Sequence, residues 1–557
     1  MKTILFLMTG LILSIILCCS SGPTQFRKFA ESSYREAVEF DPVWANGIGI
    51  HDYDGMLPDY SDEAIARRDA MLRAELDSLM RYDTTGWSID DQIDYRIQLA
   101  NLEYTTESCI EPYSPASFIN DIEAGIVSIV MSENLAFTEK TRAFNSILRE
   151  IPKFLQIAEY RITTYPHEDY LCASILREPV LEEHIKKYTD VIIDSIPELN
   201  AEISTNRDKA IIAIKTFIAD TGARFKSAYE PEQWDNGKEL NRTIKNAFFI
   251  DFDIDSVLVI LENQYNYAYS LYRYYSFPHH SNNKNADYGE NFFETEIDKR
   301  TEAYYLAQID TLIIFLNENN ILTVSADYPH PQLKQFPRYL MYNLNSLNCL
   351  IVPGYYDDNQ IATLFIEGAL QKPFEDIDDT YKLELRDVLL TKVVPGYYLQ
   401  NYLSSRNKPV YRTVTDDTVQ KEIWSLYIKE YMYGSGVMGE NREAMDELYS
   451  EIRDYAMAAI IEINMNLGKY DFAGAYKQVE ERYGIEEAKN FKQTSWCSCI
   501  NPAGNLSVIL GRYLILDMRQ KAQAKEGRNF SIKRFHDCIL SEGDVPIPLI
   551  AWKYGWQ

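Results

Sequence analysis

Basic residues are scarce in this chain of 557 residues. It has 55 Lys and Arg against 83 Asp and Glu, which gives a formal net charge of −28. Phosphate binding needs a clustered basic surface, so this balance argues against nucleic acid as a partner and against a patch for anionic lipids. The densest basic run, Arg519–Arg534, also carries Glu526 and is typical of a solvated helix face and loop.

Long apolar runs are missing after the N-terminus, so the body of the chain has no sequence that predicts a membrane span. The one apolar run, Ile4–Leu17, has 14 residues and follows Lys2. It is short for a bilayer span and typical of a signal peptide.

The end of this run predicts a lipid anchor. An apolar residue stands three positions before Cys19 and the small Cys18 stands directly before it, which resembles the lipobox of bacterial lipoproteins. We expect Cys19 to be lipidated, by an acyl chain such as palmitate, with an ordinary secretory signal as the alternative. The predicted organisation is a lipoprotein signal peptide at 1–18, a short tether at 19–25 and one two-lobed domain at 26–557.

Cysteine is also sparse. Six residues lie beyond the signal: Cys109, Cys172, Cys349, Cys497, Cys499 and Cys538. Exported proteins can form disulfides, but a domain of this size does not need them. The spacing of Cys497 and Cys499 is compatible with a metal or redox role, and buried structural cysteine is the interpretation that we favour.

Several hydrolase motifs are absent. The chain has no His-Glu-x-x-His, no Gly-x-Ser-x-Gly and no glycine-rich phosphate loop. It has 7 histidines, of which His279 and His280 are adjacent in a predicted loop and are not favoured as metal ligands. His51 lies in a turn rich in Gly and Asp, where bonding to the turn backbone is favoured over metal binding.

Apolar periodicity predicts a mainly α fold. Ser61 followed by two acids is typical of a capped helix start, and that helix should run to about Arg81. Further helices are expected at about 89–108, 139–163, 179–195, 206–226, 254–276, 291–319 and 442–467. The chain has 41 tyrosines, and a cluster of them at 265–275 favours a core or interface over a cofactor site.

The pattern changes between about 321 and 367. Short β-branched and aromatic runs alternate there with turns, at 321–324, 349–356 and 360–366. These runs predict a small sheet or paired extended segments.

The stretch Leu389–Gln400 follows an amphipathic helix and is interrupted by Pro395 and Gly396. Proline removes a backbone donor and glycine loosens the chain, so the helix should stop or bend there. The stretch resembles the hallmark His-Glu-x-x-Pro-Gly-His-His-x-Gln of an uncharacterised bacterial family, domain of unknown function 885, whose members look like zinc peptidases. The resemblance implies a large bilobal, helical, metallopeptidase-like body with the small β element before the motif helix.

This chain departs from the hallmark at each chemical group. The two later histidines fall on Tyr397 and Tyr398, while the first histidine and the glutamate fall on Thr391 and Lys392. The scaffold residues are kept: Val393, Val394, Pro395, Gly396, Leu399 and Gln400. The resemblance therefore implies a degenerate member with no metal and no cofactor.

Later segments extend the resemblance from about Phe40 to Trp552. Glu422 matches a distal carboxylate ligand and is retained, whereas Asn466 replaces a further histidine and Val508 replaces a polar residue. A zinc hydrolase needs three ligands and a carboxylate base, and an ammonium at the base position repels the metal. We expect Lys392 to occupy the place of the metal charge and to form a buried pair with Glu422.

These observations favour a non-catalytic envelope lipoprotein, periplasmic or surface-exposed, that binds a peptide or a protein partner in the inherited cleft. The expected cleft residues are Tyr355, Tyr356, Lys392, Tyr397, Tyr398 and Glu422. In the peptidase-like relatives a sheet edge borders this cleft and can hold a peptide by strand addition. Two alternatives remain open: a hydrolase with a rearranged or metal-independent site, and a structural subunit of an envelope assembly.

Overall fold

The computed structural model describes residues 22–108, 115–162, 168–228, 237–250, 252–276, 299–337, 348–366, 379–413, 418–439, 441–470, 472–485, 488 and 504–557. Several predictions fall outside these residues: the signal peptide at 1–18, the anchor Cys19, the adjacent His279 and His280, and Cys109, Cys497 and Cys499. In the described part of the chain, no helix is long and apolar enough to cross a membrane.

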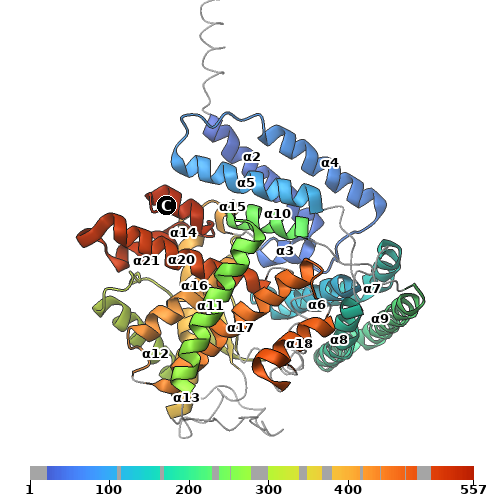
Figure 1. Ribbon diagram of the computed structural model, residues 1–557. Helices are drawn as coiled ribbons and strands as arrows, with labels where there is room; N and C mark the ends of the chain where they lie inside the picture. The colour runs from blue at the N-terminus through green and yellow to red at the C-terminus, as the bar shows by residue number, and fades with distance from the viewer. Residues whose placement is uncertain are drawn as a thin grey trace, which may run out of the picture.

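The fold is mainly α with one small sheet, as predicted (Figure 1). The elements before the sheet are α2 (Gly22–Ala37), η1 (Val38–Phe40), α3 (Pro42–Gly47), η2 (His51–Tyr53), α4 (Asp62–Leu79), α5 (Ile89–Ser108), α6 (Pro115–Met131), α7 (Phe137–Arg161), α8 (Glu168–Ser195), η3 (Pro197–Leu199), α9 (Asn200–Ala228), α10 (Gly237–Phe248), α11 (Ile254–Ser276) and α12 (Lys299–Glu318).

The sheet consists of β1 (Gln332–Gln335), β2 (Asn348–Ile351) and β3 (Thr363–Ile366). The helices that follow are α13 (Asp379–Val388), the π-helical η7 (Leu389–Val393), α14 (Tyr397–Asn407), α15 (Val410–Thr413), α16 (Thr418–Gly434), α17 (Arg442–Asn466), α18 (Phe472–Tyr483), α20 (Gly504–Glu526), η8 (Gly527–Asn529), α21 (Ile532–Ser541) and α22 (Ile547–Tyr554).

Helices with a clear start signal and period were predicted well. The Ser61 hydroxyl accepts a hydrogen bond from the Ala64 backbone N–H at 3.3 Å, which caps α4 as expected. Helices α5 and α11 have the predicted bounds. Helix α6 was missed because apolar residues cover most of its faces, so that its sequence has no polar stripe to reveal the period.

The sheet has the order β1-β3-β2, with β1 parallel and β2 antiparallel to β3. The expected strand at 321–324 is wrong, because Ile321 and Leu322 are buried in an irregular segment. Strand β1 was missed because its sequence, Gln-Leu-Lys-Gln, is polar and partly exposed.

The central strand separates two apolar cores. Leu364 and Ile366 of β3 pack into the larger core, which is built from the helices that follow the sheet together with α10–α12. Phe365, which points the other way, packs into a second core formed mainly by α6–α9. Figure 1 shows α7, α8 and α9 gathered on one side of the molecule, and α11 and α17 side by side across its middle.

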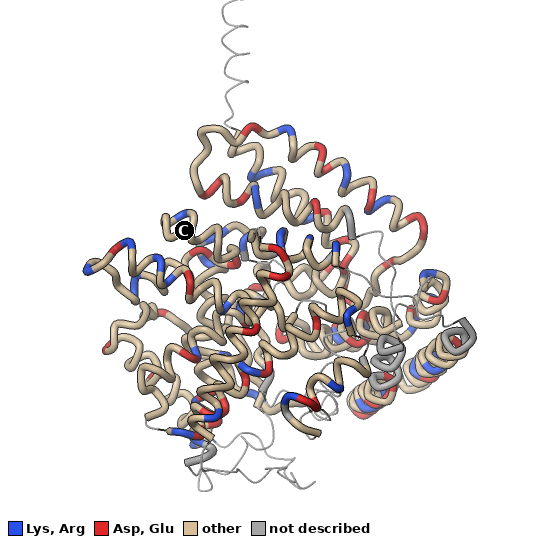
Figure 2. The backbone as a smooth tube through the Cα atoms, in the orientation of Figure 1, with Lys and Arg blue, Asp and Glu red and all other residues tan. Residues whose placement is uncertain are grey.

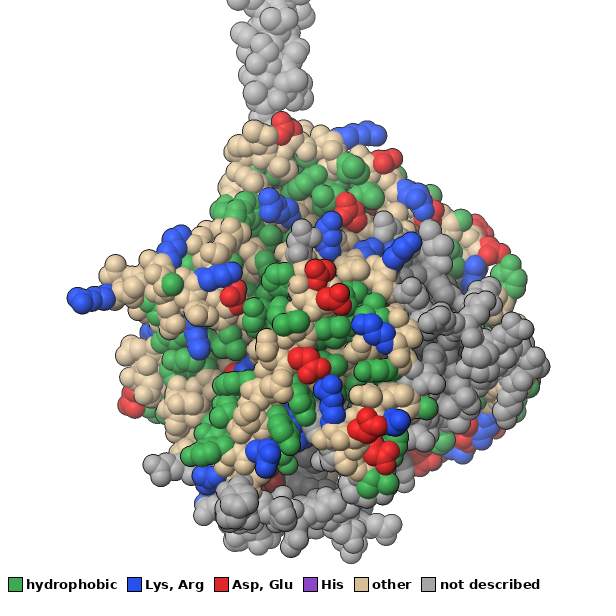
Figure 3. All heavy atoms as spheres, viewed as in Figure 1, with side chains coloured by type: hydrophobic (Ala, Val, Ile, Leu, Met, Phe, Trp, Pro, Cys, Tyr) green, Lys and Arg blue, Asp and Glu red, His purple; other side chains and the backbone are tan. Residues whose placement is uncertain are grey.

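Charged residues of both signs are interspersed along the helices (Figure 2). On the face drawn in Figure 3, basic side chains stand singly among apolar and acidic ones. The described residues of that face form no continuous basic patch of the kind that nucleic acid needs.

Candidate functional site

The predicted interruption of the motif helix is present. Helix α13 continues into the π-helical η7, and α14 begins only after Pro395 and Gly396. A Cβ atom at Gly396 would collide with the Thr391 carbonyl, so the chain can bend this tightly only at glycine. The backbone oxygens released by the break find partners in α16, where the Trp424 indole donates to the Pro395 carbonyl at 2.8 Å.

The replaced motif positions are bonded to the backbone. The Thr391 hydroxyl donates to the Asp387 carbonyl at 2.8 Å, within its own helix. Tyr398 is buried, and its hydroxyl accepts a hydrogen bond from the Ala362 backbone N–H at 3.2 Å. Tyr398 therefore ties α14 to the residue that precedes β3, whereas the Thr391 hydroxyl is bonded within the motif helix.

Two other replaced positions are packed into the larger core. The Asn466 amide donates to the Glu462 carbonyl at 2.9 Å, and Val508 is buried. A polar side chain at the end of α17 is thus bonded to its own helix, and the apolar Val508 of α20 packs into the larger core.

The buried pair of Lys392 with Glu422 is wrong. Glu422 lies on an exposed position of α16, and no ion pair joins it to Lys392 among the described residues. Its neighbour Lys421 faces inward instead, with 8% of its surface exposed, as does Lys429 further along the helix with 7%. Successive helix residues point about 100° apart, so the rotation of α16 decides which of the two is buried.

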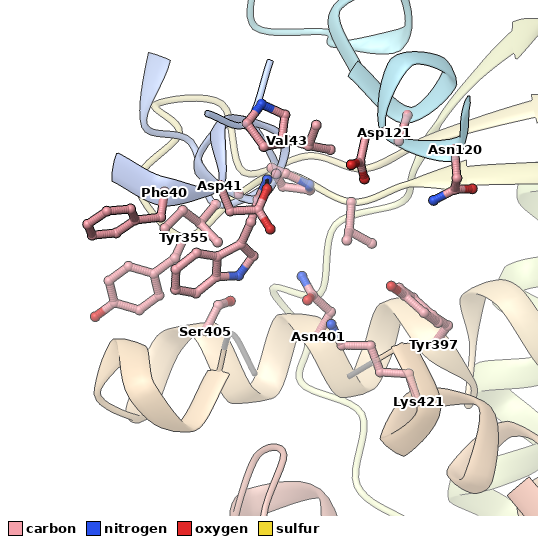
Figure 4. Close-up of a pocket in the computed structure, with 18 of the residues that line it drawn as sticks. Phe40, Asp41, Val43, Asn120, Asp121, Tyr355, Tyr397, Asn401, Ser405 and Lys421 are labelled. Atoms are coloured by element: carbon pink, nitrogen blue, oxygen red, sulfur yellow. Dashed lines mark hydrogen bonds between the residues drawn. The ribbon is translucent and has the colours of Figure 1, made fainter. Parts of the chain in front are cut away.

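A pocket with a volume of about 490 Å³ opens beside the motif helix. One wall comes from η1, α3, α6 and the loop at 352–355, and the other from α14 and α16. Pro58, Tyr60 and, from α4, Arg68 also line the pocket. Tyr397, Asn401 and Ser405 line it at i, i+4 and i+8, which is one face of α14. Figure 4 shows these side chains and Lys421 on the side opposite Asp41 and Asp121.

The acidic wall contains a carboxyl group with a raised pKa. Burial raises the pKa of Asp121 to about 7, against the opposing effect of a hydrogen bond that the Tyr60 hydroxyl donates at 2.8 Å. Asp41 nearby raises this pKa further, and its own carboxylate accepts from the Trp44 backbone N–H at 3.0 Å. The Asp121 carboxyl is therefore close to half-ionised at neutral pH.

The opposite wall carries a positive charge. The Lys421 ammonium lies 5.1 Å from the centroid of the Tyr397 ring, a distance that permits a cation–π contact. Burial raises the pKa of the Tyr397 hydroxyl, which stays neutral and can donate a hydrogen bond. This wall thus offers a cation and a phenol donor to an acidic group.

One polar atom of the pocket has no protein partner. The indole nitrogen of Trp44, a lining residue, is buried and makes no hydrogen bond within the described structure. A buried N–H without a partner is costly, and an acceptor from a ligand would satisfy it.

The loop at 352–355 is fixed by His51. Its ring nitrogens lie 3.0 Å from an Asp54 oxygen and 3.1 Å from an Asp357 oxygen, and these two carboxylates raise the pKa of His51 to about 10. The other Asp357 oxygen accepts from the Gly354 N–H at 2.7 Å. The expected bonding of His51 to turn backbone is therefore wrong, because two carboxylates take that place.

Glycine allows this close contact. A Cβ atom at Gly354 would collide with the backbone of Ile48 and Gly49, and Gly49 itself has a φ of +85°. The Tyr356 N–H donates to the Ile48 carbonyl at 2.9 Å across the same contact.

Of the expected cleft residues, Tyr355 and Tyr397 line the pocket. Tyr356 packs behind it with its ring 5.7 Å from the Arg35 guanidinium, Tyr398 is buried, and Lys392 and Glu422 are not among the lining residues. Sequence reasoning missed these polar lining residues: Asp41, Trp44, Tyr60, Arg68, Asn120, Asp121, Asn401, Ser405 and Lys421. The polar stripe of α14 after Pro-Gly was the available signal.

The part of the chain that the structure describes contains no group of three or more His, Cys, Asp or Glu side chains that could hold a metal ion. The pocket offers facing charges, phenol and amide groups and aromatic walls. Such a set can bind and orient a small zwitterionic or amide-containing molecule.

The fold is shared with two solved structures. A candidate lipoprotein of unknown function from Shewanella oneidensis has a TM-score of 0.69 at 16% identity, over 94% of this chain and 98% of that one. A candidate lipoprotein from Colwellia psychrerythraea has a TM-score of 0.71 at 14% identity, over 96% of this chain and 99% of that one. At this identity the likeness concerns the fold alone.

No curated protein matches the chain. The model of the family described as "Bacterial protein of unknown function (DUF885)" matches residues 42–259 and 350–553, which is most of the sequence and includes the lining residues of the pocket except Phe40 and Asp41. The chain belongs to this bacterial family of unknown function.

Proposed function

We propose that this protein is a lipid-anchored protein of the bacterial envelope that binds short peptides in the pocket between Asp121 and Lys421 without cleaving them. The N-terminal sequence with Cys19 supports the anchor. The likeness to two candidate lipoproteins supports a place in the envelope.

The facing charges of the pocket carry this proposal. A peptide with free ends has an ammonium and a carboxylate. The pocket has Asp41 and Asp121 on one wall and Lys421 on the other, and Arg68, beside the Phe40 ring, is a second basic lining residue. Asn401 and Ser405 lie on the same wall as Lys421 and suit peptide amide groups, while Tyr355 and Tyr397 provide aromatic surface for side chains. The volume of about 490 Å³ lies within the roughly 300–1,000 Å³ of small-ligand sites.

The motif positions support binding over hydrolysis. Thr391 and Tyr398 are bonded to the backbone, and Lys392 stands where the family hallmark has the glutamate. An open pocket also favours ligand binding over a structural subunit with a filled cleft.

The test is calorimetric titration of the full chain at pH 8 with the tripeptide Ala-Tyr-Ala and with its N-acetylated and C-amidated forms. Lys421→Gln should weaken binding of the free tripeptide about tenfold, which corresponds to roughly 1.4 kcal/mol. The same substitution should barely affect binding of the C-amidated peptide, because that peptide has no terminal carboxylate that could pair with Lys421. Asp121→Asn should weaken binding of the free tripeptide and barely affect the N-acetylated peptide, because the acetylated peptide has no terminal ammonium.

Lys521→Gln is the matched control, since Lys521 is exposed on α20 and paired with Asp517 at 2.9 Å. Equal effects of Lys421→Gln and Lys521→Gln, or no binding of any peptide, would refute the proposal. Mass spectrometry of the same mixtures tests for cleavage. Shortened peptides that depend on the intact pocket would replace the proposal by the rearranged hydrolase.

A further inference from the structure

A second cavity, of about 590 Å³, lies between α11, α16 and α20, away from the residues that line the first pocket. Helices α16 and α20 pack closely, and Gly511 permits this contact because a Cβ atom at that position would collide with the Ile423 side chain. Its polar and aromatic lining includes Tyr267, Tyr427, Glu430, Tyr431, Arg512 and Arg519. The proposed peptide pocket makes no use of these residues.

The two arginines of this cavity differ in their partners. Arg512 is buried, and its Nε and Nη2 donate to one Glu430 oxygen at 3.0 and 2.6 Å, so the two charges compensate each other. Arg519 forms no ion pair with a carboxylate of the described residues, although acids exceed bases by 28 in this chain. One net positive charge therefore remains among the lining side chains.

Arg519 is held in place by a chain of hydrogen bonds from the core. The Nδ1 atom of His536 lies 2.9 Å from the Ile321 carbonyl, which can only accept, so Nδ1 carries the proton. The Nε2 atom, 2.9 Å from the Tyr427 hydroxyl, must then accept from that hydroxyl. The Tyr427 oxygen in turn accepts from Arg519 Nη1 at 3.4 Å.

Aromatic rings complete the site. The Arg519 guanidinium lies 5.8 Å from the ring centroids of both Tyr427 and Tyr431, so the cation has two aromatic neighbours. At the rim, Tyr267 has 47% of its surface exposed. Among the described residues, one hydrogen bond from Nη1 to the Tyr427 oxygen is the contact that the guanidinium makes with an acceptor. Its other N–H groups match the planar fork of a carboxylate.

We propose that this cavity is a second binding site, for a small organic monoanion whose carboxylate pairs with Arg519 and whose apolar part lies against the tyrosines. The single uncompensated charge favours a monoanion, because the nearby Glu430 carboxylate repels a second negative charge. Phosphate-like dianions should therefore bind more weakly than carboxylates.

The test uses the full chain and three ring-shaped probes at constant ionic strength: benzoate, neutral benzamide and cationic benzamidine. Saturation-transfer NMR titrations should give saturable binding of benzoate and at least tenfold weaker binding of the other two. Arg519→Gln should weaken benzoate binding at least tenfold. Lys521→Gln, which removes an exposed charge from the same helix, should leave it unchanged.

Lys421→Gln separates this site from the first pocket. If Lys421→Gln abolishes benzoate binding and Arg519→Gln does not, benzoate occupies the first pocket and the second site is refuted. No benzoate binding in the millimolar range, or equal binding of benzoate and benzamide, also refutes it. Failure of peptide binding in the first pocket would leave this inference standing.

Discussion

His51 fixes the loop at 352–355 in the wall of the first pocket, and His536 fixes Arg519 in the second through Tyr427. The two histidines differ in charge. His51 joins two carboxylates, and its pKa is raised to about 10. His536 is buried between a carbonyl and a tyrosine hydroxyl, and burial lowers its pKa to about 4. The partners decide the charge, since acids keep a proton on the ring and an apolar setting removes it.

The difference matters for how each pocket is held. The charged His51 connects segments 306 residues apart in the chain and keeps the loop at 352–355 against α3. The neutral His536 carries a directional relay, with one nitrogen as donor and the other as acceptor, that ends at Arg519. The first pocket thus depends on an ionic clamp and the second on a fixed tautomer.

His51→Ala should give the largest effect. It leaves Asp54 and Asp357 facing each other without the cation, and we expect a loss of about 3 kcal/mol, at the lower end of the roughly 3–5 kcal/mol for breaking a buried pair. Urea unfolding at pH 6, where the clamp is fully formed, measures it. His330→Ala is the control, because His330 pairs with an Asp310 that is 61% exposed and should lose under about 1 kcal/mol. Equal losses would show that the clamp is no stronger than a surface pair.

His536→Phe keeps a buried ring but removes both hydrogen bonds. Two buried groups, the Ile321 carbonyl and the Tyr427 hydroxyl, lose their partner, which should cost about 2 kcal/mol. Benzoate binding should weaken as well, because Arg519 loses the fixed Tyr427 oxygen. His536→Gln can restore one hydrogen bond and should lose less. An unchanged unfolding midpoint in His536→Phe would contradict the relay.

The two histidines should also respond oppositely to pH. The stabilisation by His51 is complete below its unfolded-state pKa of 6.5 and is lost as pH rises toward 10. His536 has a lowered pKa, so its folded state resists protonation and its contribution is present above 6.5 and lost as pH falls toward 4. Melting temperatures of wild type, His51→Gln and His536→Gln are measured between pH 4 and 9.5. The difference between wild type and His51→Gln should shrink as pH rises, and the difference between wild type and His536→Gln should shrink as pH falls. If both variants differed from wild type by the same amount at every pH, the opposite charge states of the two histidines would be refuted.

Periodicity and capping were sufficient to predict much of the fold. Ser61 with its acids marked α4, and the Pro-Gly pair marked the break before α14. The polar strand β1 and the apolar helix α6 were missed because each depends on packing against distant segments. Local sequence has no signal for such packing.

The site was harder to predict for the same reason. The tyrosines at 355 and 397 were expected at a cleft and line the pocket, but Lys421 was overlooked in favour of its neighbour Glu422. The two residues are adjacent, and only the packing of α16 decides which of them turns inward. His51 and Asp357 are too far apart in sequence for any motif to connect them.

The smallest predicted effect concerns the acidic wall of the first pocket. Asp121 has a pKa of about 7, so a rise from pH 6 to pH 8 ionises it in the unliganded pocket and should strengthen binding of the free tripeptide by about three- to tenfold, or roughly 1 kcal/mol. Asp121→Asn should remove this dependence, because the amide does not titrate, and the N-acetylated peptide should show none even with wild type. Calorimetry at pH 6, 7 and 8 measures all three cases. A pH dependence that persists in Asp121→Asn would assign the titrating group to the ligand or to another wall residue. The first pocket would then have no carboxylate that pairs with the peptide ammonium, and it would no longer differ in charge from the monoanion site at Arg519.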